Sequence, residues 1–161
     1  MDLKLIWKKK FFSNHYRIFE HGHQIGELIN KPFSNTTKAK LNGEEYIFKT
    51  TGFFNRNTEI IDSSGNVVGK IDYGSLMRKA TISTKESVNS LKFDNSWNTK
   101  WSIQNKNRTE IKYAGSSTKG EIESKVDDSI LLLSGLFITN YYWQTMVAVM
   151  IAIMIPIMAN S

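Results

Sequence analysis

The sequence of 161 residues contains no cysteine and only two prolines, Pro32 and Pro156. Without cysteine the chain has neither disulfide bonds nor thiolate chemistry, so the fold does not require an oxidising compartment. Its first residues also lack a secretory signal, because the lysines at positions 8–10 follow too short an apolar stretch. We therefore expect a cytoplasmic protein and keep association with a membrane as an open alternative.

Charge is missing from the last 33 positions. All 21 basic and 15 acidic residues lie between Asp2 and Asp128, and together they give a net charge of +6. This distribution predicts one domain, 1–161, made of a polar segment, 1–128, and an apolar segment, 129–161. The positive net charge favours anionic partners.

Catalytic and metal-binding motifs are also missing. The sequence contains no Gly-x-Ser-x-Gly, no Gly-x-Gly-x-x-Gly and no P-loop. Its three histidines, His15, His21 and His23, lie early in the chain, and no later residues supply the spacing of a metal site. We therefore expect a protein that is not an enzyme, with no catalytic residues, no metal and no cofactor.

The polar segment instead shows a repeated period of two. In residues 119–126 every second residue is charged and the intervening ones are small or apolar, which is typical of a half-buried strand. Turns such as Asn42-Gly43 separate the runs and predict tight antiparallel hairpins. Twelve strands are predicted, at 4–8, 15–20, 24–29, 38–41, 46–49, 58–62, 67–73, 78–83, 90–93, 101–104, 109–113 and 119–126.

Three of the predicted hairpins resemble one another. Each has a glycine in its second strand, at Gly26, Gly69 and Gly120, and the intervals of 43 and 51 residues are too irregular for a propeller or a solenoid. Glycine within a strand usually marks a bend or a close approach by another backbone. We therefore expect related hairpins within one closed, strongly curved sheet.

The apolar segment predicts one long helix. Asp127 and Asp128 supply an N-cap and negative charge at its start, and residues 129–158 have no polar stripe. Such a helix lies in a protein core or in a bilayer. Because twelve strands enclose more space than their own side chains fill, the predicted fold is all-β with one long hydrophobic helix: an antiparallel closed barrel of about twelve strands around a central C-terminal helix.

The chain resembles the tubby C-terminal-like superfamily, which includes LURP-one-related proteins and phospholipid scramblases. The resemblance rests on the twelve strands, the glycine-containing hairpins and the order of a last strand, 120–126, that leads directly into Asp127-Asp128-Ser129-Ile130-Leu131-Leu132-Leu133. It implies a twelve-stranded barrel around a central hydrophobic helix. Tubby itself uses a basic patch on the barrel to bind phosphoinositides, so the resemblance also implies lipid binding.

Two segments are candidate contact sites. The first interleaves aromatic and basic residues, as in a surface that contacts anionic lipid or single-stranded nucleic acid: Trp7, Lys8, Lys9, Lys10, Phe11 and Phe12. The alternative is an edge strand that its lysines protect from aggregation. A further basic patch is conjectured from strand residues, namely Lys38, Lys40, Lys49, Arg56, Arg78 and Lys79.

The second candidate is the far end of the helix, which is longer than a barrel of short strands requires. We expect residues 129–143 in the lumen and 146–159 beyond it, too few to cross a bilayer alone. The residues expected to contact a membrane or a partner are Met146, Val149, Met150, Ile153 and Met154.

Three functions are therefore open. The first is a non-catalytic lipid- or membrane-associated binding module. The second is a tail-anchored protein in which 136–158 spans a bilayer, although the acidic flank at 127–128 argues against it. The third is a structural or protein-interaction domain. Expected partners are an anionic phospholipid or membrane surface, and a second copy or another protein at the helix end; a nucleic acid is not expected.

Overall fold

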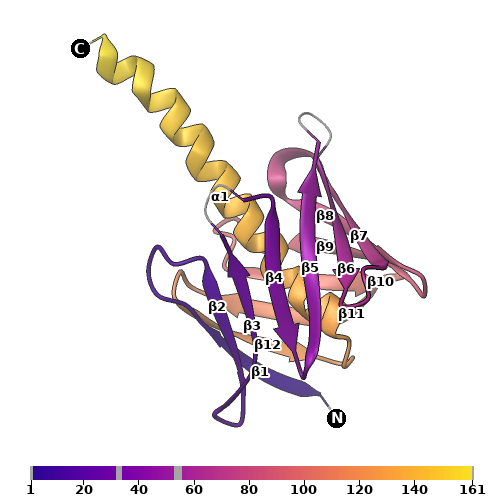
Figure 1. Cartoon of the computed structure of the whole chain (residues 1–161). Helices are drawn as coiled ribbons and strands as arrows, with labels where there is room; N and C mark the ends of the chain where they lie inside the picture. The colour runs from indigo at the N-terminus through magenta and orange to yellow at the C-terminus, as the bar shows by residue number, and fades with distance from the viewer. Residues whose placement is uncertain (1, 32–33, 53–55, 161) are drawn as a thin grey trace.

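The computed structural model describes residues 2–31, 34–52 and 56–160, and Pro32 lies outside them. In this part of the chain twelve strands, one short 3₁₀ helix and one long α-helix follow one another (Figure 1). The strands are β1 Leu3–Lys8, β2 His15–Glu20, β3 His23–Asn30, β4 Thr36–Leu41, β5 Glu44–Thr51, β6 Asn57–Asp62, β7 Val67–Tyr73, β8 Lys79–Thr84, β9 Val88–Phe93, β10 Lys100–Asn105, β11 Arg108–Gly115 and β12 Lys119–Ser124. The helices are η1, Ser75–Met77, and α1, Ser129–Ala159.

The strands form a closed antiparallel barrel in which each strand pairs with its neighbours in sequence. The last strand closes the sheet against the first, with Leu3 opposite Ser124 and Lys8 opposite Lys119. All twelve predicted strands are present, and the predicted fold class is confirmed. Alternation sets the two faces of the wall, as in β12, where Gly120, Ile122 and Ser124 are buried and the residues between them are exposed.

Two of the related hairpins share a β-bulge at the same point. The β2–β3 register shifts after the pair Ile18–Gly26, and the β6–β7 register shifts after the pair Ile60–Gly69. A bulge increases the local twist of a sheet, which helps a barrel wall to curve. At Gly26 the neighbouring backbone approaches closely, since a Cβ there would lie 2.5 Å from the Lys40 carbonyl oxygen. The recurring glycine therefore marks a close approach of two strands at Gly26 and Gly120, whereas a Cβ at Gly69 would lie 3.4 Å from the Ser83 carbonyl oxygen, an ordinary contact.

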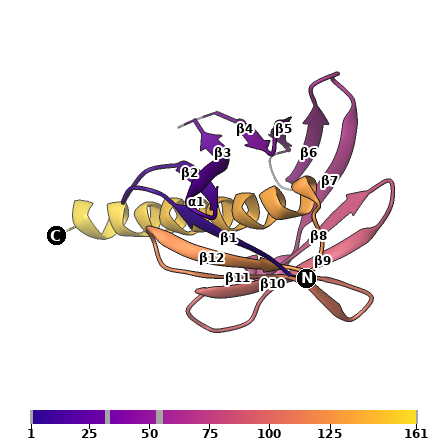
Figure 2. The same cartoon turned by 90° about the horizontal axis from the view of Figure 1, so that it is seen from below.

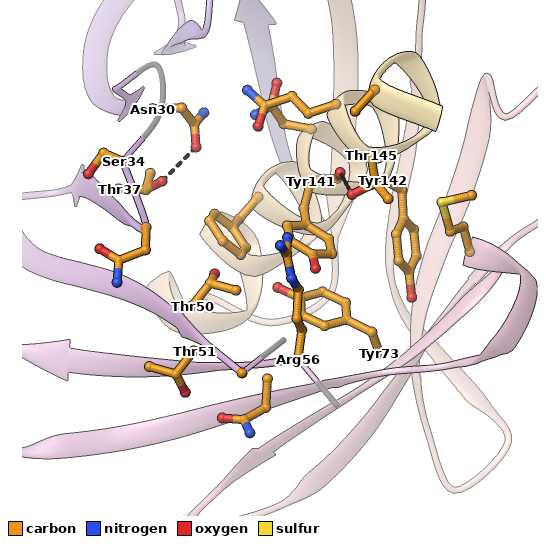
Figure 3. Close-up of a pocket in the computed structure, with 18 of the residues that line it drawn as sticks. Asn30, Ser34, Thr37, Thr50, Thr51, Arg56, Tyr73, Tyr141, Tyr142 and Thr145 are labelled. Atoms are coloured by element: carbon orange, nitrogen blue, oxygen red, sulfur yellow. Dashed lines mark hydrogen bonds between the residues drawn. The ribbon is translucent and has the colours of Figure 1, made fainter. Parts of the chain in front are cut away.

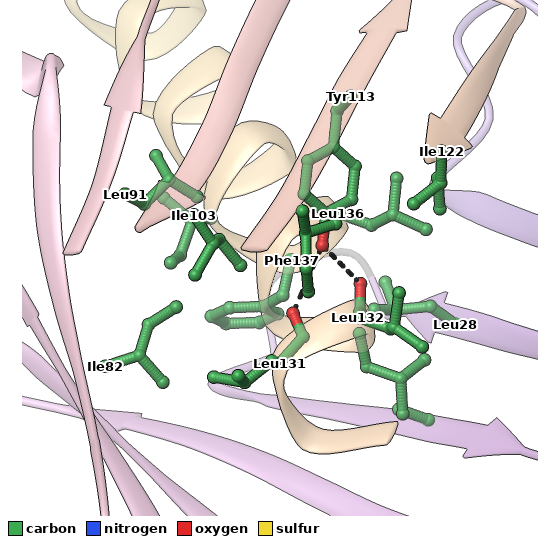
Figure 4. Close-up of a cluster of buried hydrophobic side chains, with 14 of the residues drawn as sticks. Leu28, Ile82, Leu91, Ile103, Tyr113, Ile122, Leu131, Leu132, Leu136 and Phe137 are labelled. Atoms are coloured by element: carbon green, nitrogen blue, oxygen red, sulfur yellow. Dashed lines mark hydrogen bonds between the residues drawn. The ribbon is translucent and has the colours of Figure 1, made fainter. Parts of the chain in front are cut away.

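The first half of α1 fills the barrel. Asp128 caps it, because its Oδ1 accepts a hydrogen bond of 3.1 Å from the Leu131 amide. The helix then buries an apolar run against the inward side chains of the strands (Figure 4). Phe137, for example, lies with its ring centroid 4.7 Å from that of Phe48 on β5.

Tyr113 on β11 and Trp101 on β10 join the helix to the barrel wall by hydrogen bonds. The Tyr113 hydroxyl donates to the carbonyl oxygens of Leu131 and Leu132, at 3.2 and 3.0 Å (Figure 4). Trp101 Nε1 donates to the Gly135 carbonyl oxygen at 3.2 Å. The two aromatic rings stack on each other, 5.3 Å apart. Buried polar groups are thus paired directly with the helix backbone, which fixes the position of the helix along the barrel axis.

The second half of α1 lies outside the barrel. Tyr142 is the last buried residue among those described, and from Trp143 to Asn160 the side chains are half-buried or exposed. Figure 1 and Figure 2 show the helix continuing well past the ends of the strands. The predicted division of the helix is confirmed to within a few residues. We refer to residues 143–159 as the half-helix.

Candidate functional site

The half-helix leaves the barrel at one defined end. Helix α1 follows β12, so it enters beside Ser124 and Leu3 and leaves at the end where β1 reaches Lys8. Because the strands are antiparallel and consecutive, the connections at this exit end are those that follow the odd-numbered strands. We define the exit rim as residues 9–14, 31, 34–35, 52, 56, 74–78, 94–99 and 116–118, with the strand residue on either side of each connection. The entry rim is the corresponding set at the other end of the barrel, residues 21–22, 42–43, 63–66, 85–87, 106–107 and 125–128 with their flanking residues.

Charge is distributed unevenly between the two rims. Among the described residues of the exit rim one is acidic, Asp94, and nine are basic: Lys8, Lys9, Lys10, Lys31, Arg56, Arg78, Lys79, Lys100 and Lys119. The entry rim carries four basic residues and six acidic ones, Glu20, Glu44, Asp62, Glu86, Asp127 and Asp128. The exit rim therefore has a net charge of +8 and the entry rim −2, which together account for the net charge of +6 of the whole chain.

Exposed aromatic side chains also gather at the exit rim. Phe12 is 87% exposed and Trp97 86%, and Phe11 beside Phe12 is exposed as well. Phe12 has a φ of +61°, a backbone conformation that is strained for a bulky residue. Trp143 is exposed where the helix leaves the barrel. Exposed large aromatic rings are unfavourable in water, and a group of them is typical of a surface that contacts a membrane or a partner protein.

The predicted aromatic and basic segment belongs to this rim, except for its first residue. Lys8, Lys10, Phe11 and Phe12 are exposed. Trp7 is only 2% exposed and packs against Gly115 and Gly120 inside the wall, so its prediction as a lipid contact is wrong. Strand alternation explains the error, because Trp7 points inward where Lys8 points outward.

Lys9 is held in place by the rim itself. Its Nζ donates to the Ser13 carbonyl oxygen at 3.2 Å and lies 5.7 Å from the centroid of the Tyr16 ring. Partial burial lowers the pKa of Lys9 from its ordinary value. The charge of Lys9 is thus fixed in position, whereas Lys10 extends into solvent.

The conjectured patch of strand cations is divided by the structure. Arg56, Arg78 and Lys79 lie in the exit rim. Lys38, Lys40 and Lys49 point outward from the wall formed by β4 and β5. The sequence interpretation missed four other rim residues, Lys31, Lys100, Lys119 and Trp97. The order of antiparallel strands is the signal that would have placed them at one end.

The half-helix continues the contact surface beyond the rim. Met146 is half-buried, and the other four predicted contacts, Val149, Met150, Ile153 and Met154, are exposed. Among the described residues α1 is the one helix with the length and composition to cross a membrane, and 6% of its most apolar 18-residue window is buried. From Ala148 to Ala159, uncharged and apolar surface therefore extends around the whole circumference of the half-helix.

A groove opens in the exit rim at the base of the half-helix. Its volume is about 1600 Å³, and it lies between the ends of β3, β5 and β7 and one side of α1 (Figure 3). The strand side is polar, with Thr50, Thr51 and Arg56 on the wall opposite Tyr141. Asn30 and Thr37 form part of the same wall and are joined by a hydrogen bond of 2.7 Å from the threonine hydroxyl.

Tyrosines separate the groove from the apolar interior. Tyr73 stacks on Tyr141 at 4.2 Å, and its hydroxyl is hydrogen-bonded to Thr58 Oγ1 at 2.5 Å. Tyr142 donates to the Lys79 carbonyl oxygen. Burial raises the pKa of Tyr73 and raises that of Tyr142 to about 12. Both hydroxyls are therefore neutral at physiological pH. Where the helix leaves the barrel, the Tyr73–Tyr141 ring stack joins it to β7 and the Tyr142 hydroxyl joins it to β8.

The chain has no match among known proteins that would assign a function to this end of the barrel. Comparison with protein-family models, with curated proteins and with solved structures finds no match. Among the described residues no three histidine, aspartate or glutamate side chains come together as metal ligands. What the exit rim brings together is a set of basic residues, several exposed aromatic side chains and the apolar half-helix.

Proposed function

We propose that the protein is a non-catalytic, membrane-attached binding module whose half-helix lies in the lipid bilayer and whose exit rim contacts anionic headgroups. One observation carries the proposal: the uncharged half-helix emerges through the one rim that is both strongly basic and rich in exposed aromatic side chains. We further propose that the chain is a tubby-like protein, because a closed barrel of twelve strands around a C-terminal helix is what that resemblance implies.

Burial of the half-helix supplies the first part of the free energy of binding. Besides Trp143, eight large apolar side chains are exposed there: Val149, Met150, Ile151, Ile153, Met154, Ile155, Ile157 and Met158. Apolar residues favour the bilayer by roughly 0.3–0.6 kcal/mol each on an insertion scale. Together these residues favour the bilayer by about 3–4 kcal/mol.

The exit rim supplies the second part. A basic residue near an anionic membrane surface contributes about 1 kcal/mol, and the contribution falls off within a Debye length of roughly 10 Å. Phe11, Phe12, Trp97 and Trp143 suit the same depth, because aromatic rings favour the boundary between headgroups and acyl chains. Apolar and electrostatic attraction therefore act at one end of the molecule and in one direction.

The length of the half-helix limits how deeply it reaches. Its 17 residues extend about 25 Å, slightly less than a hydrocarbon core of roughly 30 Å. Leu136, Phe137 and Ile138 are buried in the barrel, so a tail anchor that begins at residue 136 does not fit this fold. A membrane segment would begin after Tyr142. Since basic residues flank membrane segments on the cytoplasmic side, the barrel is proposed to lie on the cytoplasmic face.

The test compares two lysine substitutions in the full-length chain, one on the half-helix and one at the opposite end of the barrel. Ile153 is 59% exposed and lies about 15 Å beyond Trp143, near the middle of a bilayer that the half-helix enters upright. Ile153→Lys should weaken flotation with vesicles of phosphatidylcholine and phosphatidylserine by roughly a hundredfold, since lysine at that depth costs about 3 kcal/mol. Val88→Lys is the control, because Val88 is 65% exposed but lies in the entry rim.

Each result of the flotation experiment decides the proposal. Flotation of the wild-type chain and of Val88→Lys, with loss of flotation for Ile153→Lys, supports it. Failure of the wild-type chain to float at low salt overturns it. Equal flotation of both variants also overturns it, because the half-helix then does not lie in lipid. A concentration-dependent dimer of the wild-type chain, lost in Ile153→Lys, would assign the half-helix to a second copy instead.

A further inference from the structure

One face of α1 is turned to the groove along about four turns of helix. The residues on this face follow the helical spacing of three and four, and they are Phe137, Asn140, Tyr141, Gln144, Thr145, Ala148, Val149 and Ala152. The polarity of the face changes along its length. Near the barrel it carries two amides and two hydroxyls, and beyond Thr145 it carries only small or branched apolar side chains.

Asn140 lines the groove, and its side-chain oxygen has no hydrogen-bond donor among the described residues. Ser134, Thr139 and Thr145 bind their own helix, each donating to the carbonyl oxygen four residues earlier. Asn140 is only 2% exposed, and its Oδ1 accepts no hydrogen bond from the described residues. A buried amide oxygen without a donor is costly, so this position suits a ligand with an O–H or N–H group.

The opposite wall of the groove offers positive charge. Lys31 and Arg56 line it, and neither forms an ion pair with the described residues. Figure 3 shows the Arg56 side chain directed toward Tyr141 across the groove. Asp72 also lines the groove, but its carboxylate lies 3.6 Å from Lys70 Nζ. The charge that remains available in the groove is therefore positive.

We propose that the groove holds one phospholipid molecule, with its phosphate beside Arg56 and Lys31, its headgroup hydroxyl or amine donating to Asn140, and one acyl chain along Ala148 and Ala152. This inference rests on the proposed function, because the groove opens in the rim that faces the bilayer. From Asn140 to Ala152 the helix rises about 18 Å, close to the half-thickness of roughly 15 Å of a hydrocarbon core.

Two simpler ligands leave part of the groove unmatched. An inorganic anion satisfies the cations but does not cover the apolar face at Ala148 and Ala152. A fatty acid covers that face but brings no donor to Asn140 at the pH where its carboxylate is ionised. A phospholipid with a glycerol or ethanolamine headgroup supplies all three groups, a headgroup donor for Asn140, a phosphate for the cations and an acyl chain for the apolar face.

The experiment measures phospholipid retained by the purified full-length chain. Phosphatidylglycerol is added to the protein in a non-ionic detergent, and native mass spectrometry counts the lipids bound. The wild-type chain should retain one. Arg56→Gln should bind about tenfold more weakly, since a charge-assisted hydrogen bond is lost. Arg78→Gln is the matched control, because it removes the same charge from the same rim but does not line the groove.

A second pair of variants tests the apolar wall. Ala148→Trp fills the groove beside the helix and should abolish retention. Ile151→Trp adds the same side chain to the half-helix away from the groove and should leave retention unchanged. Equal losses in Arg56→Gln and Arg78→Gln, or in Ala148→Trp and Ile151→Trp, would overturn the assignment. Displacement of the lipid by equimolar inorganic phosphate or glycerophosphoglycerol would show that the groove takes a free anion and would also overturn it.

Failure of this inference is separable from failure of the proposed function. Flotation with vesicles should be the same for Arg56→Gln and Arg78→Gln, because both carry the same net charge. A wild-type chain that floats but retains no phosphatidylglycerol overturns the groove assignment alone. A chain that does not float overturns the membrane proposal, whatever it retains in detergent.

Discussion

Replacing Gly135 with alanine should loosen the contact between the helix and the barrel wall. A Cβ at this position would lie 2.6 Å from Tyr113 Cε2 and still closer to Cζ and the hydroxyl. The Tyr113 ring has no room to retreat, because it is fully buried and stacks on Trp101 at 5.3 Å. Either the ring or the helix must move.

The size of the effect follows from three contributions. Overpacking of a core costs about 1–3 kcal/mol. Moving the ring weakens the Tyr113 hydrogen bonds to Leu131 and Leu132, each worth about 1 kcal/mol. Alanine regains about 1 kcal/mol of helix propensity over glycine. The net loss for Gly135→Ala is about 2–3 kcal/mol, which lowers the melting temperature of a chain of this size by roughly 5–10 °C.

Urea denaturation followed by near-ultraviolet circular dichroism measures this loss, and a double-mutant cycle identifies its cause. Tyr113→Leu alone should be destabilising because it leaves a cavity. Combined with Gly135→Ala it should cost less than the sum of the two, since the smaller side chain makes room for the Cβ. Additive losses, or a Gly135→Ala chain as stable as the wild type, would refute the close packing of Gly135 on Tyr113.

Three further predictions concern charge, pH and the helix cap. Lys10→Gln should weaken binding to anionic vesicles several-fold at low salt, whereas Lys85→Gln on the entry rim should not, as flotation can measure. Burial raises the pKa of Tyr113 well above its ordinary value of 10.0, so the unfolded chain ionises first. Stability should therefore be complete below pH 10, fall as the pH rises above it, and fall less in Tyr113→Phe. Asp128→Ala should destabilise the protein by about 1 kcal/mol in urea, because the helix loses its cap.

The sequence was sufficient to predict the barrel because the period of two survives in nearly every strand. A stretch such as 119–126 separates charged from apolar residues so regularly that its two faces are evident before any pairing is known. The helix was predictable for a related reason, since no charge interrupts residues 129–161 and Asp128 marks the start. Local patterns of this kind depend on neighbouring residues, so they can be recognised without tertiary structure.

The exit rim could not be predicted in the same way because its residues come from six connections that are distant in sequence. Lys31 and Lys119 are isolated cations when the chain is read from one end to the other. Trp7 was misplaced because an aromatic residue beside lysines was assigned to the surface, whereas strand alternation turns it inward. The groove was not anticipated either. Asn140 and Gln144 are two isolated polar residues in an apolar helix when the sequence is taken alone, and their common face has meaning only beside the wall of the barrel.

Depth-dependent fluorescence quenching tests the membrane account most directly. Tryptophan replaces Ile153 in a chain whose exposed Trp97 and Trp143 are changed to phenylalanine, which leaves only Trp7 and Trp101, both buried in the barrel. Vesicles contain phospholipid brominated in the middle of the acyl chain. Strong quenching of the tryptophan at position 153, with little quenching of the same chain lacking it, is the predicted result. Emission from position 153 that is unchanged by brominated lipid would contradict the claim that the half-helix enters the bilayer.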